Sequence, residues 1–116
     1  MRHRKKGKIL DRKVGPRRAL LKSLALNFVL NGKMTTTEAK AKAIKPIVER
    51  LITRAKENNL NNYRLIDSYL QSREATKKLV EEIGPKYKER PGGYCRIIKV
   101  GPRKGDSAEM VILELV

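Results

Sequence analysis

The feature that most constrains the fold is a run of positive charge at the N-terminus. Residues 1–18, MRHRKKGKILDRKVGPRR, contain nine Lys or Arg and one acid, Asp11, and so carry half of the chain's net charge of +16. So few apolar side chains accompany them that the segment cannot bury enough surface to offset its ordering entropy. Its like charges also repel until a polyanion neutralises them. We therefore expect residues 1–15 to form a basic tail that a partner orders, and residues 16–116 to form one folded domain.

Nucleic acid explains the distribution of this charge better than the alternatives do. A solvated charge run is the plainest alternative, and a polybasic segment can also bind anionic membranes. Membrane anchoring normally needs a second, apolar signal, and Ile9-Leu10 is a poor one. A nuclear-localisation signal would account for residues 4–6 but not for charge that continues to Lys22. The chain has one Phe, four Tyr and no Trp, which argues against a base-stacking single-strand binder and favours recognition through phosphates and shape.

The first half of the folded domain shows a helix, a strand and a second helix. Residues 17–31 have apolar side chains three and four apart in a wide stripe, which predicts a central helix covered on most sides. Pro16 suits the first turn of that helix. Residues 33–36 predict a brief strand. The second helix should then run to about Asn58, with Pro46 kinking or dividing it.

Local signals predict where the helices begin and end. Thr35 or a following Thr should cap the second helix, and Glu38 completes a capping-box pattern with Thr35. Ser72 should cap a later helix that Gly84-Pro85 stops. The short helix before Ser72 is expected to turn four side chains inward: Leu65, Ile66, Tyr69 and Leu70.

The C-terminal quarter reads as an antiparallel hairpin. Residues 94–100 and 110–115 are rich in β-branched side chains, and a long turn over residues 101–107 joins them. The element order is therefore helix, strand, three helices and two strands, which is the order of a two-layer α+β domain without repeats.

Catalytic and metal-binding groups are hard to assemble from this sequence. His3 is the only histidine and lies in the tail, and Cys95 is the only cysteine, so neither a Cys–His pair nor a thiolate cluster is expected in the folded domain. A lone strand cysteine is more often a small core residue. We therefore predict a non-enzymatic protein that needs no cofactor and no metal.

Two glycine-containing loops could serve either as simple turns or as phosphate-binding loops. Gly92-Gly93 and the turn from Gly101 to Gly105 lack Walker spacing, and turn chemistry explains them. Glycine also lets a backbone approach phosphate. Four cations flank these loops: Arg90, Arg96, Arg103 and Lys104.

Motifs over essentially the whole length resemble those of the bacterial-type large-subunit ribosomal protein seventeen family. The resemblance is carried by Met1-Arg2-His3-Arg4-Lys5, Arg17-Arg18-Ala19-Leu20, Thr35-Thr36-Thr37 with Lys40-Ala41-Lys42, Gly84-Pro85, Pro91-Gly92-Gly93-Tyr94-Cys95-Arg96-Ile97, Arg103-Lys104-Gly105-Asp106 and Ile112-Leu113-Glu114-Leu115. It implies a structural constituent of the large (50S) ribosomal subunit that binds its ribosomal RNA and supports assembly and translation. It also implies ribosomal neighbours of the protein thirty-two and protein twenty-two types.

The basic residues are then the expected RNA contacts. The main set is Arg2, His3, Arg4, Lys5, Lys6, Lys8, Arg12, Lys13, Arg17, Arg18 and Lys22. The second set, held by the folded domain, is Lys40, Lys42, Arg90, Arg96, Arg103 and Lys104. We expect a soluble protein of cytoplasmic ribosomes, with an organellar ribosome left open. An architectural DNA-binding protein is the alternative.

Overall fold

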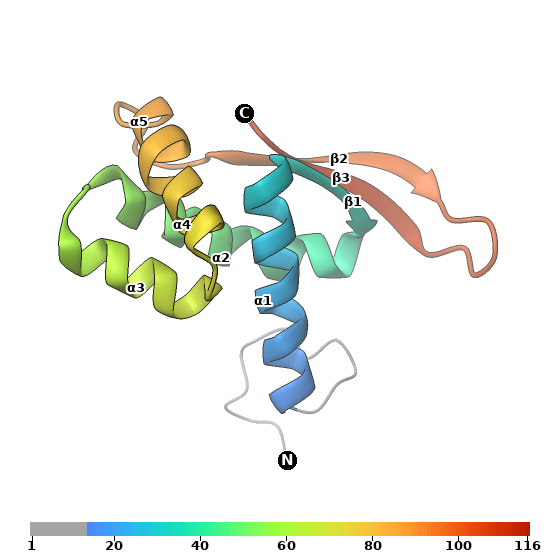
Figure 1. Cartoon of the computed structure of the whole chain (residues 1–116). Helices are drawn as coiled ribbons and strands as arrows, with labels where there is room; N and C mark the ends of the chain where they lie inside the picture. The colour runs from blue at the N-terminus through green and yellow to red at the C-terminus, as the bar shows by residue number, and fades with distance from the viewer. Residues whose placement is uncertain (1–13) are drawn as a thin grey trace, which may run out of the picture.

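A computed structural model describes residues 14–116, which form an α+β domain (Figure 1). In chain order the elements are α1 (Val14–Asn31), β1 (Lys33–Thr37), α2 (Glu38–Lys56), α3 (Leu60–Leu70), α4 (Arg73–Lys78), the π-helical turn η1 (Leu79–Ile83), α5 (Gly84–Lys86), β2 (Cys95–Pro102) and β3 (Glu109–Leu115). Segments α4, η1 and α5 follow one another without a break and together correspond to the last of the three helices predicted between the first and second strands. The predicted order of elements and the α+β fold class are therefore confirmed. No helix among the described residues is long and apolar enough to cross a membrane.

The three strands form an antiparallel sheet in the order β1-β3-β2. Thr36 pairs with Val111 across β1 and β3, and Ile97 pairs with Leu113 across β2 and β3. Val111 and Leu113 are fully buried on the inner face. The hairpin that β2 and β3 form reaches beyond the helices in Figure 1 and ends in its long turn. An irregularity at Val100 interrupts the pairing near that end.

Helix α2 is the central element of the domain. It contacts α1, α3, η1, α5 and all three strands. The sequence pattern predicts a buried stripe of Ala43, Ile44, Ile47, Val48, Leu51, Ile52 and Ala55. All of these are buried except Ile47, which is partly buried, and Ala41 is buried in addition. Pro46 lies on the exposed side and does not divide the helix, which ends at Lys56, two residues before the predicted Asn58.

Helix α1 differs from its prediction in both length and burial. It begins at Val14, three residues before the predicted start. Its fully buried side chains are Ala25, Phe28 and Val29, all in the C-terminal half. The N-terminal half extends away from the sheet in Figure 1, and its leucines are only partly buried. The expectation of a central helix covered on most sides is therefore wrong, because α2 occupies the centre.

Both predicted caps form, at Ser72 and at one of the threonines before α2, but the predicted capping box does not. Ser72 Oγ accepts a hydrogen bond from the Ala75 amide at 3.3 Å and caps α4 as predicted. For α2 the cap is Thr37, whose Oγ1 accepts from the backbone N of Lys40 at 3.4 Å. Thr37 is one of the threonines that follow Thr35, as predicted. The capping box of Thr35 with Glu38 does not form, because the cap lies two residues after Thr35.

Gly84 does not stop the helix, contrary to the prediction. Its backbone is right-handed helical, and the helical path continues through η1 into α5. A Cβ at Gly84 would lie 2.5 Å from the backbone oxygen of Ala55. Glycine is therefore needed here because two helical segments approach each other closely, not because a turn needs its flexibility.

Helix α3 lies against the core with fewer side chains than predicted. Ile66 and Leu70 are buried and Tyr69 is partly buried, but Leu65 is 42% exposed. Successive residues point about 100° apart around a helix. Once Ile66 faces the core, its neighbour Leu65 therefore lies at the edge of the contact.

Candidate nucleic-acid interface

Eight of the predicted RNA contacts lie outside the described residues 14–116, and the structure does not place them. They are Arg2, His3, Arg4, Lys5, Lys6, Lys8, Arg12 and Lys13. The tail that we expect a partner to order also falls almost entirely in this part of the chain.

The nine predicted contacts that the structure does place are spread over several elements. They are Arg17, Arg18 and Lys22 on α1, Lys40 and Lys42 on α2, Arg90 in the loop before β2, Arg96 on β2, and Arg103 and Lys104 in the β2–β3 turn. Most are exposed, and Arg17, Lys22 and Lys40 are half-buried. Two of these nine, Arg18 and Lys22, line a common hollow.

Three of these nine residues are paired with carboxylates in the domain. Lys42 Nζ lies 2.6 Å from Glu38 Oε1, and Arg96 Nε lies 2.7 Å from Glu114 Oε1. The third pair joins Arg103 to Asp106. Such exposed pairs contribute little to stability. Each nevertheless cancels a positive charge locally, so these three residues attract phosphate less strongly than the sequence suggests.

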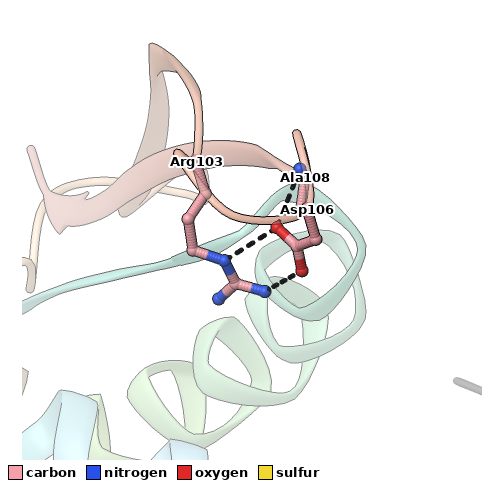
Figure 2. Close-up of polar contacts among 3 residues, drawn as sticks. All are labelled: Arg103, Asp106 and Ala108. Atoms are coloured by element: carbon pink, nitrogen blue, oxygen red, sulfur yellow. Dashed lines mark hydrogen bonds and ion pairs between the residues drawn. The ribbon is translucent and has the colours of Figure 1, made fainter.

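The Arg103–Asp106 pair holds the hairpin turn, as Figure 2 shows. Arg103 Nε and Nη2 donate to the two carboxylate oxygens of Asp106 at 3.0 and 2.5 Å. Asp106 Oδ1 also accepts from the backbone N of Ala108 at 3.2 Å. The pKa of Asp106 lies well below its usual range. The hydrogen bond from Arg103 is the largest cause, and the hydrogen bond from the Ala108 amide is the next. Lys104, between them in sequence, makes no ion pair with any carboxylate of residues 14–116 and is the freer cation of this turn.

An open groove of about 680 Å³ lies between α1, α2 and α3. Four cations line it, namely Arg18 and Lys22 from α1 and Arg50 and Arg54 from α2. The other lining residues are Ala19, Leu21, Ile47, Leu51 and Tyr69. None of the described residues that line the groove is acidic, so within residues 14–116 it combines apolar walls with a positive rim.

Sequence reasoning missed Arg50 and Arg54 as candidate contacts. The helical pattern indicates only that both lie on exposed sides of the second helix. The available signal was their spacing of four residues, beside Ile47 and Leu51, which puts two cations at the edge of an apolar stripe. Their meeting with Arg18 and Lys22 depends on how α1 packs against α2, which spacing alone does not reveal.

Comparison with known proteins identifies the family. A family model described as ribosomal protein L17 matches residues 20–116. The chain belongs to this family. It is 49% identical to the large ribosomal subunit protein bL17 of Gemmatimonas aurantiaca, over 100% of this chain and 98% of that protein. It is 46% identical to the bL17 of Dictyoglomus thermophilum over the full length of both. It is 50% identical to the bL17 of Salinibacter ruber, of which it spans 59%.

Membership of the ribosomal protein L17 family confirms the resemblance that the sequence motifs indicated. The family is a structural, non-enzymatic component of the large ribosomal subunit. The prediction that this chain is not an enzyme is confirmed on that basis.

Cys95 is packed in the core of this L17 family member. Burial, followed by the nearby Glu49 charge, raises the pKa of the Cys95 thiol to about 12. The thiol therefore stays protonated and unreactive at neutral pH, as expected of a small core residue.

Two lysines of the domain hold the fold together by hydrogen bonds to backbone oxygens. Lys78 Nζ donates to the Leu30 carbonyl at 2.6 Å, at the C-terminal end of α1, where a cation is also favoured by the helix dipole. Lys56 Nζ donates to the Arg90 carbonyl at 2.6 Å and to the Tyr94 hydroxyl at 3.0 Å. Positive charge in this family member is thus divided between residues that build the domain and residues that remain accessible.

Proposed function

We propose that this chain binds large-subunit ribosomal RNA, with the cations of residues 2–22 as the main contacts. The supporting observation is the N-terminal half of α1. It has no fully buried side chain, and it continues the positive charge of residues 1–13 onto an ordered helix through Arg17, Arg18 and Lys22. The first turn of α1 holds no acidic residue that could neutralise these cations. Phosphate would neutralise them instead.

The accessible cations of the folded domain form the second set of contacts. Arg90 and Lys104 are exposed, and neither pairs with a carboxylate of residues 14–116. Lys42, Arg96 and Arg103 reach phosphate only in competition with their acidic partners. Lys40 lies in the first turn of α2 and is half-buried. We rank the paired residues below the others.

In this proposal the RNA is recognised mainly through phosphates and folded shape, and the protein supports subunit assembly in cytoplasmic ribosomes. Ribosomal proteins of the thirty-two and twenty-two types are the expected neighbours, on the basis of the family. Cross-linking of intact large subunits checks those neighbours. Adducts only with other proteins would contradict that part of the proposal.

The test replaces the charge of the tail without removing the tail. In one variant the Lys and Arg of residues 2–13 become Gln, and in a matched variant the same residues are kept but their order is shuffled. Incorporation into large subunits is measured by sucrose-gradient sedimentation of lysates. Because phosphate binding depends on charge more than on order, we expect the Gln variant to incorporate poorly and the shuffled variant to retain most of its incorporation.

Normal incorporation of the Gln variant would contradict the tail as the main contact. Sedimentation of the unmodified protein with the nucleoid would instead favour the architectural DNA-binding alternative. The wide apolar stripe predicted for the first helix argues against that alternative, because it leaves little free helix surface for a DNA groove. The exposed N-terminal half of α1 weakens this argument, so the case for ribosomal RNA depends on the family.

A further inference from the structure

The groove between α1, α2 and α3 has a positively charged rim and an apolar wall, and each attracts a different chemical group. Within the described part of the chain, its rim holds Arg18, Lys22, Arg50 and Arg54 and no carboxylate, which suits phosphate. Its wall includes the ring of Tyr69 and aliphatic side chains, which suit a flat apolar group. The volume of about 680 Å³ falls within the range of roughly 300–1,000 Å³ typical of small-molecule sites.

Arg50 and Tyr69 lie close together at this site. Burial raises the pKa of the Tyr69 hydroxyl, and the positive charge of Arg50 acts against that shift. Arg50 Nε donates to the Pro46 carbonyl at 3.3 Å, which holds the side chain along α2. An arginine plane and an aromatic ring that face the same space are the two surfaces on which proteins stack unpaired bases.

An RNA duplex offers such a hollow no base face, because its bases are stacked on one another and expose only their edges in the grooves. An unpaired nucleotide supplies both a flat base and flanking phosphates. The main contacts proposed for ribosomal RNA include Arg18 and Lys22, which are also part of the rim. RNA that follows the tail onto α1 is therefore brought to the entrance of the groove.

We propose that this groove holds one unpaired nucleotide of ribosomal RNA, with its base against Tyr69 and its phosphates on Arg50 and Arg54. The inference rests on the proposed RNA-binding function and adds a specific site to it. The scarcity of aromatic residues argued against a protein that stacks many bases. A single ring is enough for one nucleotide.

Two pairs of variants of the full chain test this site with a large-subunit ribosomal RNA transcript as the probe. Arg50→Gln with Arg54→Gln is compared with Arg64→Gln with Arg73→Gln, which removes the same charge from exposed positions outside the groove. Tyr69→Leu is compared with Tyr63→Leu, a partly buried tyrosine that does not line the groove. Thermal unfolding checks that each member of a pair is equally folded.

We expect Tyr69→Leu to weaken binding on the order of tenfold, the size of one lost base stack, and Tyr63→Leu to leave it unchanged. Stacking releases no counterions, so the salt dependence of binding should stay the same in Tyr69→Leu. The Arg50 and Arg54 pair should weaken binding more than the Arg64 and Arg73 pair does. Equal losses within both pairs would overturn the nucleotide site. RNA binding that still depends on the tail charge would show that the broader proposal survives, and failure of the unmodified chain to bind would reject both.

A photoreactive benzophenone side chain at Ile47, in assembled large subunits, identifies the occupant. An adduct with ribosomal RNA supports the proposal. An adduct with a ribosomal protein would overturn it, because an acidic protein segment would then fill the groove.

Discussion

At Gly84 even the smallest substitution, which adds a single methyl group, should have a large effect on stability. A Cβ here would lie 2.5 Å from the Ala55 oxygen and 2.9 Å from the Ala55 carbonyl carbon, both in the backbone of α2. Neither atom can rotate away, so α2 and α5 must separate. We expect Gly84→Ala to lower the free energy of unfolding by about 1–3 kcal/mol, as overpacking does, although Ala normally stabilises a helix relative to Gly.

Urea unfolding measures this change, and Gly92→Ala is the matched control. A Cβ at Gly92 would meet no other atom within 4 Å, and the backbone there has no positive φ. The control should therefore change stability by a few tenths of a kcal/mol at most. Equal effects of the two substitutions would show that the Ala55 contact does not constrain Gly84.

At the scale of elements, the cap of α2 separates two threonines that the sequence could not tell apart. Thr37 Oγ1 accepts from the backbone N of Lys40, whereas Thr35 is an exposed residue of β1. We expect Thr37→Ala to destabilise the domain by about 1 kcal/mol, the typical value of a lost N-cap. Thr35→Ala should cost less. Thermal denaturation of both variants checks the order, and a larger loss at Thr35 would contradict the assigned cap.

The β2–β3 turn should loosen in acid. Hydrogen bonds from Arg103 and Ala108 lower the pKa of Asp106 in the folded turn. A lowered folded-state pKa stabilises the turn above the unfolded value of about 3.9, and that contribution is lost as pH falls through the folded-state pKa. We expect exchange of the Ser107 amide, which donates to the Arg103 carbonyl at 2.9 Å, to speed up on acidification beyond its intrinsic pH dependence.

Asp106→Asn removes this dependence and is the control for the turn. Its Ser107 amide should exchange faster than in the unmodified chain at neutral pH, with no further loosening in acid. Indistinguishable exchange in the two proteins would show that the carboxylate does not hold the turn.

The order of elements could be predicted because it depends on local periodicity and turn residues. The stripe of α2 and the Ser72 cap are examples. Burial of Leu65 and the role of Gly84 were predicted wrongly, since both depend on which segment packs opposite. The candidate site divides in the same way. Its cations are visible in the sequence, but the groove requires three helices to meet, and the pairing of Arg96 with Glu114 requires the register of the hairpin.

At the scale of the whole molecule, the net charge of +16 predicts RNA binding that weakens steeply with salt. If about ten phosphates are contacted, the slope of log K against log salt should be about −7 to −9. Changing Arg2, Arg4, Lys5, Lys6 and Lys8 to Gln should make the slope less steep by about 3.5–4.5, since each lost contact removes roughly 0.7–0.9. Filter binding of a large-subunit RNA transcript over a salt series measures both.

The matched control changes Glu38 and Lys42 to Gln together. These two charges already pair at 2.6 Å, so the double variant keeps the net charge and removes no free cation. Its slope should stay close to that of the unmodified chain, because Lys42 reaches phosphate only in competition with Glu38 and contributes less than an uncompensated cation. If the five tail substitutions left the slope unchanged and the control made it less steep, the domain would contribute more phosphate contacts than the tail. The phosphate contacts would then lie on the folded surface, including its paired residues.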